Sequence, residues 1–214
     1  MKVARGVTQA ILFAGAFVFS AITLSTSAPA SAGAAMDVGG ITSQPIGHYE
    51  FCKRYPSECA VRSGNVKPVK LTDTAFTMIA NVNLSVNRSV DPVSDDDAYG
   101  RQEWWAYPNE AGQRGDCEDF ALQKRRVLMK RGIASANLLM TVVRKPDGEG
   151  HAVLTVRTDQ GDYVLDNLND QVLPWEHTGY RFLKRQAENH SGRWNTIRGG
   201  STPPLVGAVR STTN

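Results

Sequence analysis

The 214-residue sequence lacks an apolar run long enough to span a lipid bilayer. Its most apolar stretch, from Ala10 to Ile22, falls short of the roughly 20 residues that a transmembrane helix needs. Lys2 and Arg5 precede this stretch, and Ala30-Ser31-Ala32 follows with the small residues at which signal peptidase cleaves. These features predict a signal peptide over residues 1–32 and export from the cytoplasm; a retained N-terminal membrane anchor is the alternative.

The sequence also lacks a strong excess of either charge. The formal net charge is +3, and the predicted leader contributes two basic residues and no acidic one, so removing it leaves 3 − 2 = +1. No cluster of Lys and Arg is interleaved with aromatic residues, and we therefore expect no nucleic acid partner. The basic run Lys124-Arg125-Arg126 lies in a predicted helix, where it indicates a solvated face.

Cysteine is scarce, with three residues in the chain. In an oxidising compartment cysteines pair, and a leftover one needs a reason to stay free. Pro56 favours a turn that would bring Cys52 and Cys59 within bonding range, which would leave Cys117 unpaired. A zinc site at the first two is disfavoured, because their spacing is wider than the usual two to four residues and no histidine pair follows.

Beyond the leader the chain shows no internal repeat and predicts one domain. Residues 33–50 are rich in Gly, Ala and Ser and predict a flexible lead-in. The Gly, Ser, Thr and Pro content of residues 199–214 predicts a disordered tail. Residues 51–198 remain as the folded domain, which is long enough to bury a substantial core.

Two segments of this domain carry helical patterns. Apolar residues recur at helical spacing from Thr72 to Val86. A second helix is predicted from Asp116 to Lys130, with Asp116 as its N-cap and Asp119 in the position of a capping-box partner. The acidic segment Asp91–Asp97 between them lacks the ligand spacing of a calcium loop and predicts a solvated loop.

Strand patterns dominate the second half of the domain. Apolar and β-branched residues separated by turns predict four strands: Leu138–Arg144, His151–Arg157, Asp162–Asn167 and Tyr180–Arg185. Trp194 is predicted to be an isolated core residue. The segment 101–115 predicts a loop with large side chains. In that loop Trp104, Trp105 and Gln113 are open to two interpretations, as oxyanion or substrate contacts and as packing residues.

Cys117 lies in the first turn of the helix predicted from Asp116. Unpaired backbone N–H groups and the positive end of the helix dipole stabilise a thiolate there and lower the pKa of a thiol. The same N–H groups, that of Cys117 included, can hold the oxyanion of a tetrahedral intermediate. A lone cysteine is otherwise commonly a buried packing residue, so its neighbours decide between the two roles.

His151 and Asp166 supply such neighbours on two adjacent predicted strands. If Thr158 to Gly161 forms a turn of even length, Arg157 faces Asp162, and Asp166 becomes a diagonal neighbour of His151 on the same face. Diagonal neighbours lie about 7–8 Å apart at Cα, which lets a carboxylate reach an imidazole. A turn of odd length would place the two on opposite faces. His151 would then act as base and acid for Cys117, and Asp166 would orient the imidazole.

Acidic residues crowd the proposed nucleophile. Asp116, Glu118 and Asp119 flank Cys117 and should raise the pKa of its thiol. Two explanations stay open. Either these side chains cap the helix and face solvent, or they bind a cation, for which Ca²⁺ is the natural choice because it takes clustered carboxylate oxygens.

Three sequence blocks carry a resemblance to a known family. They are Gly115-Asp116-Cys117-Glu118-Asp119-Phe120-Ala121, Gly150-His151-Ala152-Val153-Leu154 and Val164-Leu165-Asp166-Asn167. Together they resemble the bacterial transglutaminase-like cysteine proteinases, and the similarity extends from Phe51 to Trp194. The resemblance implies an α+β, papain-like fold in which the cysteine helix packs on an antiparallel sheet. It also implies a triad of Cys117, His151 and Asp166, with Asp116, Glu118 and Asp119 as calcium ligands.

The same resemblance implies a biological setting. In the best-known branch of the family the enzyme is periplasmic, depends on calcium and cleaves a large surface adhesin, which releases cells from a biofilm. A membrane receptor for a cyclic dinucleotide restrains it. We therefore expect an exported cysteine endopeptidase that forms a thioester intermediate. The alternatives are an acyltransferase or deamidase acting on protein glutamine with the same triad, and a non-catalytic module that binds surface partners.

Overall fold

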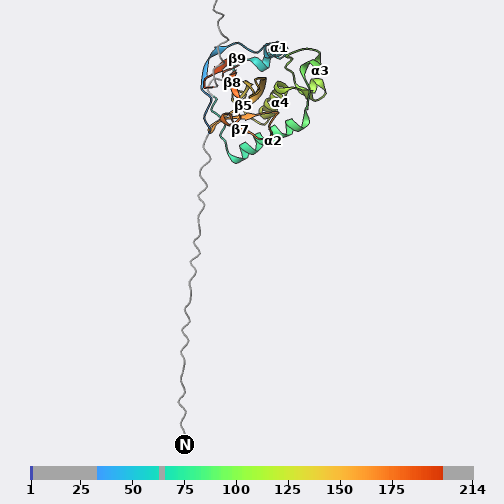
Figure 1. Cartoon of the computed structure of the whole chain (residues 1–214). Helices are drawn as coiled ribbons and strands as arrows, with labels where there is room; N and C mark the ends of the chain where they lie inside the picture. The colour runs from blue at the N-terminus through green and yellow to red at the C-terminus, as the bar shows by residue number, and fades with distance from the viewer. Residues whose placement is uncertain (2–32, 63–65, 200–214) are drawn as a thin grey trace, which may run out of the picture. The chain divides into compact units, whose positions relative to one another are not determined.

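The computed structural model describes Met1, residues 33–62 and residues 66–199 (Figure 1). The expected signal peptide, residues 1–32, lies outside this description apart from Met1, and the expected tail, residues 199–214, apart from Gly199. Within the described ranges no helix is long and apolar enough to cross a membrane. The helices are α1 (Ile46–Arg54), α2 (Asp73–Ser89), α3 (Asp95–Tyr99) and α4 (Cys117–Lys130). The strands are β1 (Val38–Thr42), β2 (Asp91–Pro92), β3 (Arg114–Gly115), β4 (Leu138–Arg144), β5 (Gly150–Thr158), β6 (Gly161–Leu165), β7 (Leu173–Pro174), β8 (Arg181–Ala187) and β9 (His190–Ile197).

An antiparallel sheet forms the centre of the fold. In the described part of the chain it has seven strands in the order β1-β9-β8-β4-β5-β6-β7. The β5–β6 hairpin pairs Arg157 with Asp162 and Thr158 with Gly161. This is the register that a turn of even length predicts, and it places His151 and Asp166 at the same end of neighbouring strands.

Helices cover one face of this sheet. α4 packs on β4 and β5, and α2 packs on α4 (Figure 1). Alternate strand residues point into this helix-covered core, among them Leu138, Met140, Leu154, Val156 and Leu165, all fully buried. The opposite face carries a second, smaller core of Met36, Val143, Val153, Val164, Phe182 and Ile197. Burial on both faces explains why apolar residues of the central strands point to either side of the sheet.

Two segments are more ordered than the sequence predicts. Residues 33–50, expected to be a flexible lead-in, contain β1 and the start of α1, so the folded unit begins well before the expected position 51. β1 pairs with β9, and the buried Met36 donates its backbone N–H to Asp162 at 2.9 Å. Trp194, expected to be an isolated core residue, belongs to β9. The two glycines of β1 give the segment a weak strand propensity, so its sequence does not predict a strand. The strand forms because it pairs with β9, which is distant in the sequence.

The basic run on α4 is not the solvated face that its charges predict. Lys124 and Arg125 are buried, and Arg126 is half-buried with its guanidinium 4.4 Å from the ring centre of Tyr107. Arg125 forms an ion pair with Glu58 at 2.7 Å and donates to the carbonyl of Leu138 at 3.2 Å. A run of charges predicts exposure only when nothing packs over it, and here α2 and the sheet pack against the helix.

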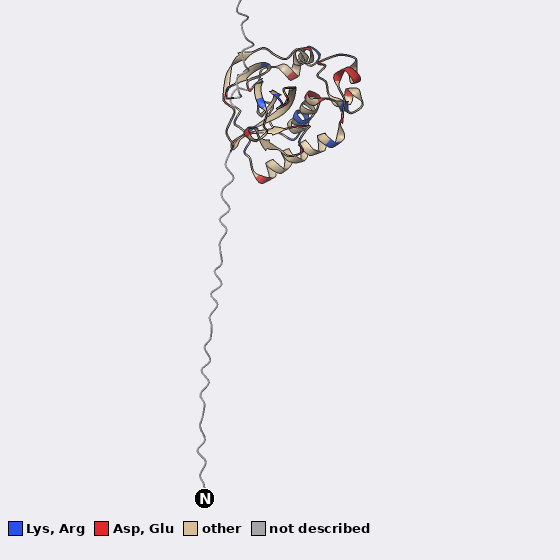
Figure 2. Cartoon of the chain, viewed as in Figure 1, with Lys and Arg blue, Asp and Glu red and all other residues tan. Residues whose placement is uncertain are grey.

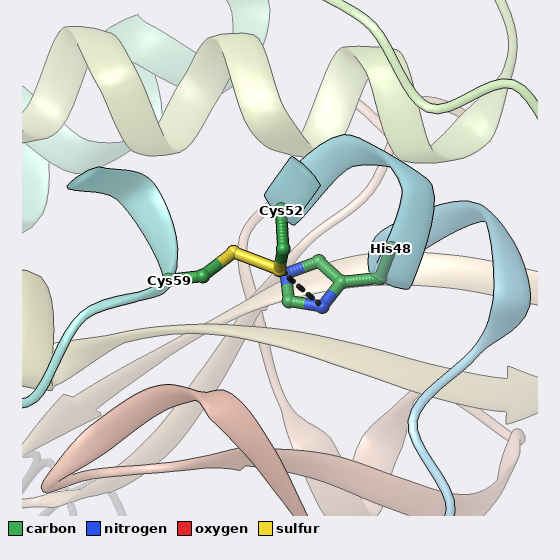
Figure 3. A group of neighbouring side chains, drawn as sticks. All are labelled: His48, Cys52 and Cys59. Atoms are coloured by element: carbon green, nitrogen blue, oxygen red, sulfur yellow. Dashed lines mark hydrogen bonds between the residues drawn. A yellow bond between two sulfur atoms is a disulfide. The ribbon is translucent and has the colours of Figure 1, made fainter. Parts of the chain in front are cut away.

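A disulfide joins the end of α1 to the short 3₁₀ helix Pro56–Cys59 (Figure 3). It links Cys52 and Cys59, whose Cα atoms are 5.5 Å apart. His48 precedes Cys52 by one turn of α1, and its Nδ1 lies 3.6 Å from the sulfur of Cys52. Because the sulfurs are bonded to each other, this group is a structural cross-link.

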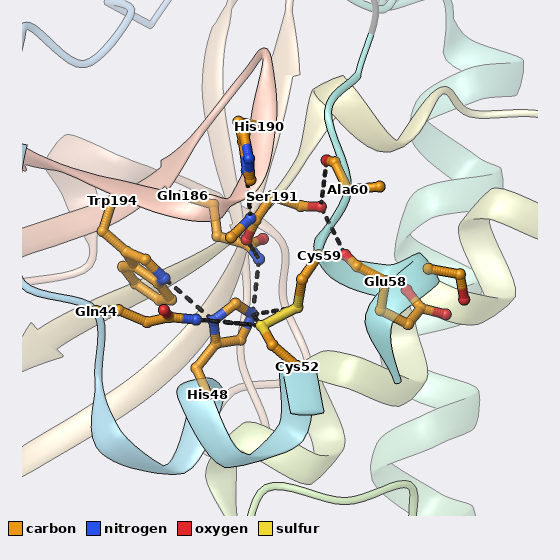
Figure 4. The surroundings of a disulfide bond; sticks show 12 residues. Gln44, His48, Cys52, Glu58, Cys59, Ala60, Gln186, His190, Ser191 and Trp194 are labelled. Carbon is orange, nitrogen blue, oxygen red and sulfur yellow. Dashed lines mark hydrogen bonds between the residues drawn. A yellow bond between two sulfur atoms is a disulfide. The ribbon is translucent and has the colours of Figure 1, made fainter. Parts of the chain in front are cut away.

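Polar groups around His48 anchor α1 to the sheet (Figure 4). Trp194 donates its Nε1–H to Nδ1 of His48 at 3.2 Å, and Nε2 of His48 lies 3.0 Å from the amide nitrogen of Gln186. Burial, with a smaller contribution from the charge of Arg125, lowers the pKa of His48 to about 3. His48 is therefore a neutral core residue at physiological pH.

Candidate active site

Cys117 is the first residue of α4, and Gly115 explains the sharp approach of the chain to this helix. A Cβ at Gly115 would lie 2.4 Å from Oδ2 of Asp119, so only glycine fits without a shift. Asp116 occupies the N-cap position, but its side chain makes no capping bond. Asp119 accepts the backbone N–H of Ala106 at 2.7 Å instead of completing a capping box. The capping interpretation is therefore wrong in its contacts, although the position of the helix start is right.

His151 and Asp166 meet at the ends of β5 and β6. Nε2 of His151 lies 2.8 Å from Oδ1 of Asp166, and both side chains are buried. The same carboxylate accepts the hydroxyl of Tyr180 at 2.6 Å through Oδ2, and the backbone N–H of Leu168 at 3.0 Å through Oδ1. Burial raises the pKa of Asp166, but the hydrogen bonds from His151 and Tyr180 outweigh it and hold the pKa below its ordinary value. Asp166 is thus an ionised acceptor for the imidazole N–H.

Cys117 shares a cleft of about 400 Å³ with His151. The sulfur accepts the backbone N–H of Ala152 at 3.4 Å, which fixes it beside β5. The thiol points to Glu118, with Sγ 3.2 Å from Oε2. Among the contacts of the described residues there is no hydrogen bond from Cys117 to His151. The fold therefore brings Cys117 and His151 to one cleft, with the thiol turned toward Glu118 and His151 already paired with Asp166.

The environment of the thiol favours its protonated form. Burial raises the pKa of Cys117 well above its ordinary value, and the charges of Glu118 and Asp116 raise it further. The hydrogen bond from Ala152 acts in the opposite direction. A reactive thiolate therefore requires that the negative charge around Cys117 be offset.

The walls of the cleft come from several elements. Trp105 is buried in one wall, while Trp104 and Gln113 are not among the lining residues, and the side chain of Gln113 is exposed. The cleft is lined by Pro45, Ile46, Glu103, Trp105, Cys117, Glu118, Val142, Gly150, His151, Ala152 and Lys184. Trp105 is thus positioned for a substrate contact, whereas Trp104 stacks under the guanidinium of Arg54 at 3.7 Å.

An acidic cluster lies close to Cys117. Ligand atoms of Asp95, Asp116 and Asp119 all lie within 4.8 Å of one another. Asp95 belongs to α3, the acidic helix coloured red in Figure 2, and it is buried where the sequence predicted a solvated loop. It accepts the backbone N–H of Trp104, which holds α3 against the loop before α4. Glu118, expected in the same set, instead groups with Asp116 and Cys117.

The residues of this cluster fit a hard cation. Oδ1 of Asp95, Oδ1 of Asp116 and Oδ2 of Asp119 are buried and have no hydrogen-bond partner among the described residues. Burial and, to a lesser degree, the neighbouring carboxylates raise the pKa of Asp95 to about 6 and that of Asp119 to about 8. Unpaired buried carboxylate oxygens are costly unless a cation coordinates them, and Ca²⁺ takes such oxygens.

Comparison with known proteins decides the family. The family model described as bacterial transglutaminase-like cysteine proteinase matches residues 38–202. The chain belongs to this family. It is accordingly a cysteine peptidase with a transglutaminase-like fold, and its substrates are proteins.

Solved structures share the fold of this peptidase. Calcium-bound LapG from Legionella pneumophila is 23% identical, covering 64% of this chain and 77% of that chain with a TM-score of 0.50. EGTA-treated LapG from the same organism is 24% identical over 54% of this chain and 64% of that chain, with a TM-score of 0.46. A comparison with curated proteins finds no match.

Tyr180 lies at the site through its bond to Asp166, although no motif in the sequence indicates a role for it. Replacing Tyr180 with Phe should lower the kcat of the peptidase about tenfold, because a hydrogen bond to a charged group is worth about 1.5–3 kcal/mol. The ring that packs on His151, with centroids 5.6 Å apart, would remain. Steady-state peptide cleavage measures the effect, and Tyr163→Phe on β6 is the matched control. An unchanged kcat would show that the Tyr180 hydroxyl has no part in orienting Asp166.

Proposed function

We propose that this peptidase is an exported endopeptidase that uses Cys117, His151 and Asp166 as a catalytic triad and cleaves a cell-surface protein such as a biofilm adhesin. The observation that carries the proposal is the shared cleft. It brings the free thiol of Cys117 beside the buried His151–Asp166 pair, although the three residues lie far apart in the sequence.

Proton transfer begins at the imidazole. The Nε2–H of His151 is held by Asp166, which leaves Nδ1 to take the proton of Cys117 and form a thiolate–imidazolium pair. A rotation of the Cys117 side chain away from Glu118 is required first, since the thiol points to that carboxylate. Asp166 stabilises the resulting imidazolium without taking its proton.

The thiolate then attacks the carbonyl carbon of the scissile peptide bond. The backbone N–H groups at the start of α4, that of Cys117 included, stabilise the oxyanion of the tetrahedral intermediate. As the C–N bond breaks, the imidazolium of His151 gives its proton to the leaving amine, and a thioester on Cys117 remains. Water, deprotonated by His151, attacks the thioester and releases the carboxylic acid and the thiol.

We infer that Ca²⁺ binds at Asp95, Asp116 and Asp119. Three unpaired carboxylate oxygens support this, as does the existence of a calcium-bound structure of LapG, which shares the fold. A bound Ca²⁺ would supply positive charge beside the nucleophile. Asp95, Asp116 and Asp119 would then keep their carboxylates ionised. The positive charge of the ion would offset the negative charge that helps to raise the pKa of Cys117.

The leader-like residues 1–32 support export, and the disulfide between Cys52 and Cys59 suits an oxidising compartment such as the periplasm. A surface adhesin as substrate and a cyclic-dinucleotide receptor as regulatory partner are proposed on the family resemblance. A cleft of about 400 Å³ that is open to solvent suits an extended protein segment.

The substrate proposal is tested by comparing cells that produce the wild-type chain with cells that produce the Cys117→Ala variant. We expect one or a few large surface proteins to be shed into the medium only by the wild type, each with a defined new terminus identified by mass spectrometry. Adding a labelled primary amine should leave those termini unlabelled, because water resolves the thioester. Incorporation of the label would instead support acyl transfer, and identical shed proteins from both strains would reject a surface substrate.

A further inference from the structure

Lys124 is a buried cation to which the chemistry described above assigns no role. It lies on α4, two turns after Cys117, and its side chain is 0% exposed. Its Nζ is buried and has no hydrogen-bond partner among the described residues. Burial lowers the pKa of Lys124 to about 7, and the charges that oppose this shift are the carboxylates of Asp166 and Asp170.

The loop 166–170, which connects β6 to β7, begins with Asp166 and is held from α2. Asn87 donates its side-chain amide to the backbone carbonyl of Asp166 and to Oδ1 of Asp170, both at 2.9 Å. One turn earlier, Asn83 donates to the backbone carbonyls of Asn169 and Asp170 at 2.9 and 3.0 Å. Asn83 is fully buried, as are Ile79, Val82 and Val86 on the same helix. A polar residue that makes these hydrogen bonds therefore occupies a position on α2 where an apolar side chain would otherwise pack.

Hydrogen bonds couple the position of the Asp166 carboxylate to that of the loop. The backbone N–H of Leu168 donates to Oδ1 of Asp166, the oxygen that also accepts His151. Asn87 fixes the carbonyl of the same residue from the other side. A shift of the loop would therefore turn the carboxylate away from the imidazole.

An unpaired buried ammonium is expensive for a fold. Desolvating a charge without a partner costs several kcal/mol, and apolar residues of similar volume are often more stable in such places. The charges that favour the ammonium form of Lys124 are those of Asp166 and Asp170, the first and last residues of the loop that Asn83 and Asn87 hold by hydrogen bonds. A buried charge that lowers the stability of the fold is expected to persist where it serves the activity of the protein.

We propose that Asn83 and Asn87, with the buried amine of Lys124 as a further group, form a positioning site that holds the loop 166–170 and keeps Asp166 directed at His151. The inference rests on the proposed triad. It assigns a task to α2, whose Asn83 and Asn87 hold the loop that begins with Asp166. None of the three residues lines the cleft, so they act through Asp166 and not on the substrate.

The first test is the Lys124→Met variant, which keeps the length of the side chain and removes its charge. We expect kcat for peptide cleavage to fall about tenfold with KM within about twofold, in the range that one nearby charge is worth. The thermal midpoint should stay the same or rise, because the desolvation cost disappears. Lys130→Met, at the exposed end of the same helix, is the matched control and should change neither quantity.

A second variant tests the hydrogen bonds. Asn87→Asp keeps the shape of the side chain but replaces its N–H donor with a carboxylate next to Asp166 and Asp170. We expect it to lower kcat by about tenfold or more. The ring ¹⁵N resonances of His151, read by NMR without any substrate, should shift as the bond to Asp166 weakens. Asn81→Ala, on the exposed face of α2, is the control.

The outcomes separate a positioning role from a structural one. If Lys124→Met lowers the midpoint while kcat stays unchanged, Lys124 serves the fold and the proposal is wrong. If both variants leave the His151 resonances in place, the loop does not control the imidazole and the proposal is also wrong. If the wild type cleaves no peptide, the proposed function fails, and the NMR comparison still decides whether the loop controls His151.

Discussion

Replacing Cys117 with Ala should reduce peptide cleavage by about 10⁴-fold or more while leaving the fold intact. Losses of this size are typical when the nucleophile of a triad is removed, since oxyanion stabilisation and binding alone remain. The sulfur makes two polar contacts, with Glu118 and Ala152, so its removal disturbs little else. Cleavage of a fluorogenic peptide library, with circular dichroism to follow the fold, measures both quantities.

The other two cysteines do not interfere with this experiment. Cys52 and Cys59 are bonded to each other, so Cys117 is the free cysteine of the chain. Under non-reducing conditions a thiol reagent should label the wild type once and the Cys117→Ala variant not at all. Ala152→Gly controls for a small change of side chain in the cleft. It alters the residue next to His151 and keeps the backbone N–H that donates to the sulfur of Cys117. Activity of Cys117→Ala above about 1% of wild type would reject Cys117 as the nucleophile.

Local rules in the sequence were sufficient to place Cys117 at the start of α4 and His151 beside Asp166. The positions of Gly115 and Asp116 fixed where α4 begins, and therefore where Cys117 lies. The short turn between β5 and β6 fixed the register, and with it the approach of His151 to Asp166. Both inferences depend on residues close in sequence or on a two-strand hairpin, where geometry follows from turn length.

Residues that meet only through long-range packing could not be predicted in this way. Asp95 is drawn into the acidic cluster because α3 folds back on the loop before α4, and an isolated acidic run gives no sign of this. Lys124 carries the charge of a surface residue but is buried on α4, the helix against which α2 and the sheet pack. Strand β1 depends on its pairing with β9, at the far end of the domain. In each case tertiary contacts override the local signal.

Adding Ca²⁺ should stabilise the peptidase strongly, and chelation should reverse the effect. At 100 times the dissociation constant a ligand contributes about 2.7 kcal/mol, which for a domain of this size raises the thermal midpoint by about 5–10 °C. Differential scanning fluorimetry with Ca²⁺, Mg²⁺ and EGTA measures it. Asp95→Asn should abolish the response, whereas Asp96→Asn, an exposed neighbour on α3, should retain it. A midpoint that does not respond to Ca²⁺ would remove the cation from this site.

The pH dependence of stability gives this prediction a definite sign. Without Ca²⁺, burial holds the pKa of Asp95 at about 6 and that of Asp119 at about 8, above the value of about 4 that both have when unfolded. Between pH 4 and 8 the folded state therefore binds more protons than the unfolded state, and stability falls as pH rises. Ca²⁺ binds the ionised carboxylates, so protons compete with it and its stabilising effect grows with pH. Melting curves with and without Ca²⁺ should diverge from pH 5 to 8, and parallel curves would mean that Asp95 and Asp119 do not hold the ion.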